Sequence, residues 1–117
     1  MHWNVLGTDE FEAWYTHTLD DAQRAAVAAR VDLLEQYGPQ LGRPTIDTLA
    51  GSKLANLKEL RVSKGGALRV IFIFDPKRSA VLLLGGSKTG RWSEWYATAI
   101  PEAETLYERY LDETGQS

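Results

Sequence analysis

Positively charged side chains gather in the middle of this sequence, in and after a series of apolar segments. Arg61 and Arg69 lie in neighbouring segments, and Lys88 and Tyr96 follow the last of them. Arginine and lysine stabilise the charge that builds on phosphorus when a phosphodiester is attacked. A lysine among other cations also exchanges protons more readily near neutral pH. RNA can be cut by its own 2′-hydroxyl, so these four candidate catalytic residues could suffice without histidine or metal.

Other cations and one aromatic ring surround the four candidates. An aromatic ring beside a basic patch can stack an unpaired base of a single strand. Trp95 is expected to pack in the core beneath the sheet instead. The predicted RNA-binding residues are Arg43, Lys53, Lys58, Lys64, Lys77, Arg78, Arg91 and Trp92.

Arg69 is the one charged residue between Ala67 and Phe74, which are otherwise all apolar. A charge in such a strand must reach solvent or a partner, because its desolvation is costly. A hairpin turn before this segment would place Arg69 beside Arg61 on the neighbouring strand. Two interpretations stay open at this point: Arg69 contacts a phosphate, or it forms a structural ion pair with Glu59.

Several common catalytic and metal-binding motifs are absent. Gly86-Ser87-Lys88-Thr89 lacks the two glycines that a phosphate loop requires, and neither HExxH nor Gly-x-Ser-x-Gly occurs. His2 and His17 lie in separate elements, and the chain has no cysteine to form disulfides or thiolate zinc sites. We therefore expect no metal and no cofactor.

The net charge of −3 hides an uneven distribution. Residues 1–42 hold seven acidic and two basic residues (−5), and residues 92–117 hold six and one (−5). Residues 43–91 hold ten basic and three acidic residues, a net charge of +7. This pattern suggests a polyanion-facing surface on an acidic body. Exposed helices that collect acids and exposed strands that collect lysines would produce the same pattern.

Length and composition indicate a single domain over residues 1–117, with room for one core. The apolar runs are too short to cross a bilayer, and the start lacks the features of a signal peptide. With no cysteine, these features favour a cytoplasmic protein without membrane contact.

The hydrophobic pattern predicts an α+β fold in the order βααβββα. A strand at 2–6 precedes two helices, one capped by Thr8 or Asp9 and one running from Asp20 or Asp21 to Gly38. Residues 39–56 are expected to form a long connection. Strands at 57–62, 67–74 and 79–84 form an antiparallel meander, with turns at 63–66 and 75–78.

Gly85-Gly86 is expected to end the third strand of the meander. A short helix capped by Ser93 follows, and Pro101 begins a second helical segment. We expect the two N-terminal helices and the C-terminal helix to pack on one face of a small, curved, mainly antiparallel sheet.

Five segments together have a familiar order and spacing: LKELRV (57–62), LRVIFIFD (68–75), LLLGGSKT (82–89), WY (95–96) and IPEA (100–103), with Tyr107 and Tyr110 after them. They resemble the phage-derived HigB branch of the RelE/ParE toxin superfamily, over essentially the whole chain. The resemblance implies a RelE-type fold and a toxin that cleaves mRNA, usually in the ribosomal A site. It also implies inhibition by a cognate antitoxin, commonly a helix-turn-helix protein, with operator DNA contacted only through that antitoxin.

The resemblance also implies roles by position. Arg61 matches the family's phosphate-contacting sheet arginine, Lys88 the basic position after the last strand, and Tyr96 the aromatic that follows. Arg69 matches a recurrent strand arginine of this branch. The chain departs from relatives that are strongly basic, and it lacks the C-terminal histidine that some relatives use. A ParE-like inhibitor of DNA gyrase and a non-enzymatic binding or regulatory module are the alternative functions.

Overall fold

The computed structural model describes residues 2–63, 67–87 and 92–116. Its five strands form one sheet in the order β1-β5-β4-β3-β2. β1 pairs with β5 in parallel and the other three pairs are antiparallel, which confirms the predicted α+β class and mainly antiparallel sheet. The elements are β1 Asn4–Gly7, α1 Asp9–His17, α2 Asp21–Tyr37, the 3-10 helix η1 Gly38–Leu41, β2 Ile46–Thr48, β3 Leu57–Val62, β4 Leu68–Asp75, β5 Ser79–Ser87 and α3 Trp92–Glu113.

Side-chain caps begin the first two helices, as the sequence predicts. The Thr8 hydroxyl accepts a hydrogen bond from the amide of Phe11 at 3.1 Å and begins α1. Asp20 and Gln23 form a reciprocal capping box at the start of α2. Gly38, with a φ of +57°, ends α2 in a conformation that favours glycine.

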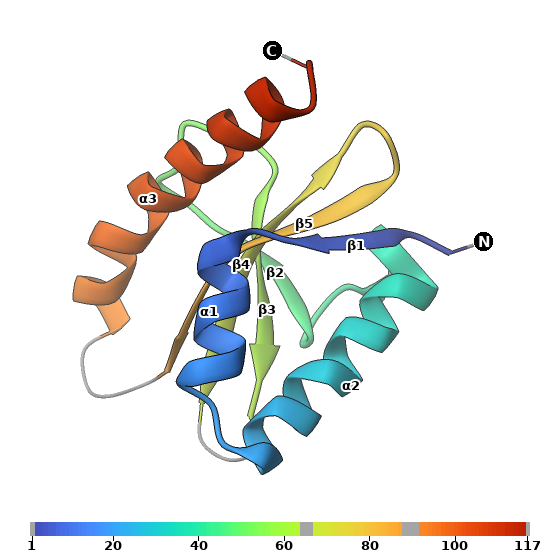
Figure 1. Ribbon diagram of the computed structural model, residues 1–117, viewed down its shortest axis with the longest axis vertical. Coiled ribbons are helices and arrows are strands. Elements are labelled where there is room, and N and C mark those ends of the chain that lie inside the picture. The colour runs from blue at the N-terminus through green and yellow to red at the C-terminus, as the bar shows by residue number, and fades with distance from the viewer. Residues whose placement is uncertain (1, 64–66, 88–91, 117) are drawn as a thin grey trace.

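Helices cover both faces of the sheet, so the expectation of a single covered face is wrong (Figure 1). Val70 and Phe72 of β4 pack with α1 and α2, whereas Ile71 and Ile73 pack with α3. The physical reason is the alternation of side chains along a strand. Where consecutive residues are apolar, both faces must be shielded from water.

Strand β5 continues through Gly85 and Gly86 to Ser87, beyond the end predicted for it. A register shift between β4 and β5 changes which residues of β5 face each side. After this shift Gly85 lies opposite Val70, and Gly86 lies opposite Arg69. Both glycines therefore lie within the sheet. Because glycine has no side chain, Gly85 leaves a flat patch of backbone on one face of the sheet and Gly86 leaves one on the other.

Two tryptophan rings occupy these flat sites from opposite sides. A Cβ added to Gly85 would lie 2.2 Å from the ring of Trp14 in α1. A Cβ added to Gly86 would lie 2.4 Å from the ring of Trp95 in α3. Glycine is required here because an indole rests directly on the backbone. The prediction that Trp95 packs in the core is confirmed.

The C-terminal region is one helix, not the two helical segments that we expected. α3 runs from Trp92 to Glu113 with Pro101 inside it. An interior proline removes one backbone hydrogen bond and costs about 3 kcal/mol. Ala99, Ala103 and Leu106 bury the inner side of α3 against the sheet on both sides of Pro101, which offsets that cost.

The connection over residues 39–56 contains structure that its sequence did not reveal. η1 follows α2 directly, and the three-residue strand β2 pairs with β3 at the edge of the sheet. Such a short edge strand has too few residues to show an alternating pattern.

Among the described residues, none of the helices has the length and apolar character needed to span a membrane.

Gly86→Ala should lower the free energy of unfolding by about 1–3 kcal/mol, because its methyl group would displace the indole of Trp95. Urea denaturation of the purified protein measures this loss. Ser87→Ala, next along β5, adds no volume and is the matched control. Equal stability of wild type and Gly86→Ala would contradict the packing described here.

Candidate functional site

Arg61 and Arg69 lie directly opposite each other on β3 and β4. Their side chains share the face of the sheet that α3 covers, together with Ile71 and Ile73. The prediction that the two arginines are close in space is confirmed. Like charges placed directly opposite destabilise a strand pair, so this arrangement needs a compensating anion.

Glu59 is that anion, and only 3% of its surface is exposed. Its carboxylate accepts a hydrogen bond from Nε of Arg61 at 2.9 Å, and Nε of Arg69 lies 3.8 Å away. The hydroxyl of Tyr96 donates to the second carboxylate oxygen. The structural ion pair between Arg69 and Glu59, one of the two interpretations left open above, is therefore present.

Three aromatic rings from the first turns of α3 lie beside this charge cluster. The centroids of Trp92 and Tyr96 are 5.9 Å apart, and each ring also contacts Trp95. The guanidinium carbon of Arg69 lies 5.3 Å from the centroid of Trp92, a cation–π contact. The sequence-predicted residues Arg61, Arg69, Trp92 and Tyr96 thus come together.

Tyr96 is a hydrogen-bond donor in this cluster. Burial and then its hydrogen bond to Glu59 raise the pKa of Tyr96 to about 12. The phenol consequently remains protonated at neutral pH and can donate, but cannot accept a proton as a general base. The two buried carboxylate oxygens of Glu59 accept hydrogen bonds from Arg61 and Tyr96.

Asp47 on the edge strand β2 extends the cluster and was absent from the sequence-based prediction. It accepts from Nε of Arg43 at 3.1 Å and from Nη2 of Arg61 at 3.1 Å. The Thr48 amide, Arg43 and Arg61 hold the pKa of Asp47 below its ordinary value. No sequence signal could have found this residue, because β2 itself was not predicted.

The remaining predicted RNA-binding residues do not join the cluster. Lys53 pairs with Glu108 of α3 at 2.9 Å, and Lys58 donates to Thr48. Lys77 and Arg78 lie in the β4–β5 turn, roughly 20 Å along the strands from Arg69. Three further predicted residues lie outside the part of the chain that the structure describes: Lys64, Lys88 and Arg91.

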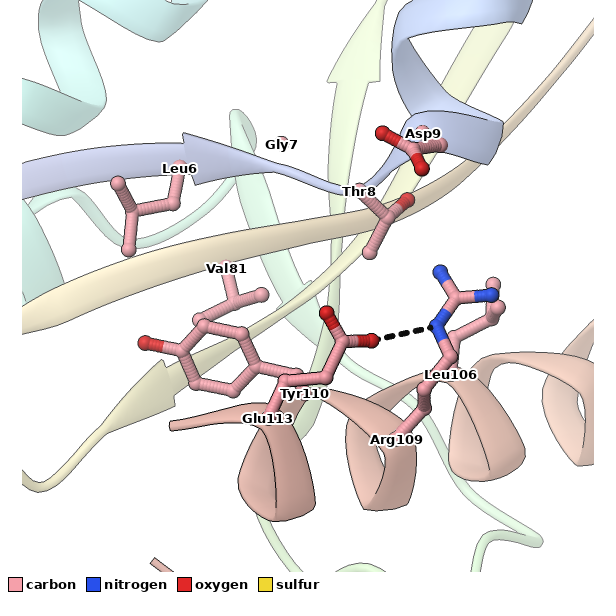
Figure 2. A pocket seen from close by; sticks show the side chains of 9 residues that line it. All are labelled: Leu6, Gly7, Thr8, Asp9, Val81, Leu106, Arg109, Tyr110 and Glu113. Carbon is pink, nitrogen blue, oxygen red and sulfur yellow. Dashed lines mark ion pairs between the residues drawn. The ribbon is translucent and has the colours of Figure 1, made fainter. Parts of the chain in front are cut away.

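A separate hollow of about 130 Å³ lies between the β1–α1 junction and the end of α3 (Figure 2). Its one cation, Arg109, is paired with Glu10 at 2.6 Å and with Glu113 at 3.2 Å. These partners occupy the guanidinium, so this hollow is a poor anion site. Within residues 2–63, 67–87 and 92–116, no three acidic or histidine side chains converge as metal ligands.

Comparisons with known proteins identify the family. Residues 15–108 match the family described as "Phage derived protein Gp49-like". A Mycobacterium tuberculosis protein named "Putative toxin HigB3" is 45% identical over 107 residues, which cover 92% of each chain. The chain belongs to this Gp49-like family of HigB-like toxins. A second relative from the same organism, named "Putative toxin HigB2", is 39% identical over 105 residues, 88% of this chain and 52% of that one.

Glu59→Gln in this HigB-like chain keeps the side-chain shape but removes the charge between Arg61 and Arg69. We expect it to lower the free energy of unfolding by about 1–3 kcal/mol, since the arginines are partly exposed and solvent moderates the effect. The loss should shrink at high salt, which screens the repulsion between the arginines. Urea denaturation at two salt concentrations tests this. Exposed Glu102→Gln is the control, and equal losses in both variants would refute the role of Glu59.

The raised pKa of Tyr96 predicts a pH dependence of stability. As pH rises, the Tyr96 hydroxyl loses its proton near the ordinary pKa of 10.0 in the unfolded chain. In the folded chain it loses the proton at a pKa of about 12. The stabilisation is therefore complete below pH 10 and is lost between pH 10 and 12. Denaturation across this range should show a steeper fall for the wild type than for Tyr96→Phe. The pKa of Tyr107 is also raised to about 12, but Tyr107 is present in both proteins. Parallel curves would mean that Tyr96 titrates normally.

Proposed function

We propose that this protein is the toxin of a type II toxin–antitoxin pair and acts as an endoribonuclease on mRNA bound to the ribosome. Membership of a HigB-like family supports the toxin role. The observation that carries the nuclease role is the directly opposed pair Arg61 and Arg69, with Tyr96 and Trp92 beside them. Two cations and aromatic rings on one face suit a single strand of RNA.

The proposed reaction is attack of an RNA 2′-hydroxyl on the adjacent phosphorus. The new bond forms from the 2′-oxygen to phosphorus, and the bond to the 5′-oxygen of the next nucleotide breaks. The products are a 2′,3′-cyclic phosphate and a free 5′-hydroxyl. One proton leaves the attacking oxygen and one reaches the leaving oxygen, so the cleavage step consumes no water.

Arg61 and Arg69 would stabilise the extra negative charge on the five-coordinate phosphorus. Arg61 is the better placed of the two, because 38% of its side chain is exposed against 19% for Arg69. Tyr96, protonated at neutral pH, would act as a neutral donor. Trp92 offers a ring on which an unpaired base can stack. Lys88 remains a proposed catalytic residue on the grounds of the sequence, since it is a cation directly after the last strand and matches the family's basic position.

An antitoxin partner belongs to the same proposal. HigB-like toxins occur with a cognate inhibitor, so co-expression of that inhibitor should prevent growth arrest. We expect the inhibitor to be a helix-turn-helix protein, through which alone the pair contacts operator DNA.

Arg61→Lys keeps the positive charge but loses the planar guanidinium that binds two phosphate oxygens at once. We expect mRNA cleavage to fall at least about 100-fold, the scale seen when one transition-state donor is lost. Mapping of new mRNA 5′ ends after brief induction measures cleavage. Arg109→Lys, in the separate hollow at the end of α3, is the control for the same exchange of cations outside the site.

The same induction distinguishes the alternative targets. Protein synthesis should stop while DNA supercoiling stays unchanged. Loss of supercoiling with intact mRNA would instead identify a ParE-like gyrase inhibitor. Normal growth without antitoxin would identify a non-enzymatic regulatory module.

A further inference from the structure

A hollow of about 280 Å³ opens beside the end of β3, and three arginines from three elements line it. Arg30 comes from α2, Arg61 from β3 and Arg69 from β4. Pro44, Thr45 and Ser63 complete its wall. Strand β2 pairs with β3 only as far as Leu60, and one further backbone hydrogen bond joins the amide of Arg61 to the carbonyl of Thr45. Beyond this point no strand of the described residues lies on the β2 side of β3, and the hollow opens there.

No acidic side chain lines this hollow among the described residues. Glu59 and Asp47 hold Arg61 but are not part of the wall. Arg61 uses Nε and Nη2 for these carboxylates, and its Nη1 has no hydrogen-bond partner within the described part of the chain. The guanidinium group of Arg61 therefore retains N–H groups that can donate to a ligand.

Arg30 is the unexpected member, since α2 belongs to the acidic part of the sequence. The neighbouring arginine of the same helix, Arg24, is held by Asp21 and by the carbonyls of Thr16 and Leu19. Arg30 has no such partner in the residues that the structure describes, and it is half-buried at the wall of the hollow. A half-buried cation without a counter-ion favours binding of an anion.

We propose that Arg30, Arg61 and Arg69 bind one phosphate group in this hollow, with the Thr45 and Ser63 hydroxyls as further donors. Guanidinium groups match the oxygens of phosphate in geometry and charge. Asp47 is shared with Arg43, so the four arginines and two carboxylates of this region leave two positive charges, an excess that favours a phosphate group. The hollow is smaller than a typical pocket for a drug-sized ligand, in keeping with a small polar group.

The source of the phosphate is the RNA backbone, an assignment that rests on the proposed nuclease function. A backbone phosphate has no base identity, so this contact would hold any RNA sequence in register with the catalytic face. Arg30 is thus a positioning and binding residue on α2, added to a site otherwise built from the sheet and α3.

The test uses the purified full chain and inorganic phosphate, with backbone amide NMR shifts as the readout and chloride at equal ionic strength as reference. We expect saturable shifts at Thr45, Arg61 and Ser63. Arg30→Gln should weaken phosphate binding about tenfold, and Arg30→Lys should recover part of the loss. Arg24→Gln removes the same charge from the same helix, at an arginine that is held outside the hollow, and should leave binding unchanged. No saturable binding, or equal binding by Arg30→Gln, would overturn the proposal.

A second arm identifies the source of the phosphate. A short oligodeoxynucleotide, which lacks the attacking 2′-hydroxyl, should compete with inorganic phosphate in the wild type. Absence of competition would overturn the backbone assignment. Neither arm contains a ribosome or measures cleavage, so the two proposals can fail separately. A chain that binds phosphate through Arg30 yet cuts no mRNA would refute the nuclease function alone.

Discussion

The structure depends on one buried carboxylate. Glu59 lies between two arginines that face each other across β3 and β4, and without it their repulsion would oppose the pairing of the strands. A buried charge is tolerated only when its partners are complete. Tyr96 supplies the remaining donor from α3, so the same carboxylate joins two strands and a helix. The candidate site and the docking of α3 are therefore parts of one electrostatic arrangement.

The docking of α3 also requires a particular surface on the sheet. The shift in register between β4 and β5 places Gly86 on the face shared by Arg69, and the absent side chain leaves room for the indole of Trp95. On the other face Gly85 receives Trp14 in the same way. These two contacts hold helices on both sides of the strand end next to the arginines. The geometry of the candidate site thus depends on packing as much as on charge.

Compensation of charge shows how the proposed RNA contact can exist on an acidic protein. Part of the positive charge of residues 43–91 is already paired: Arg43 and Arg61 with Asp47, and Lys53 with Glu108. Among the described residues, one group of arginines without an acidic wall lies where β2 stops short and Arg30 of α2 reaches the end of β3. A small uncompensated site favours recognition of one phosphate group over general attraction to a polyanion.

The sequence by itself determined the helices at the N-terminus, the meander and the proximity of Arg61 to Arg69, because caps, turns and strand alternation act between near neighbours in the chain. Only the tertiary structure decided that α3 passes unbroken through Pro101, that β5 continues past its glycines, and that Asp47 and Arg30 reach the site. These features arise from contacts between residues far apart in sequence, where burial and charge pairing override local preference.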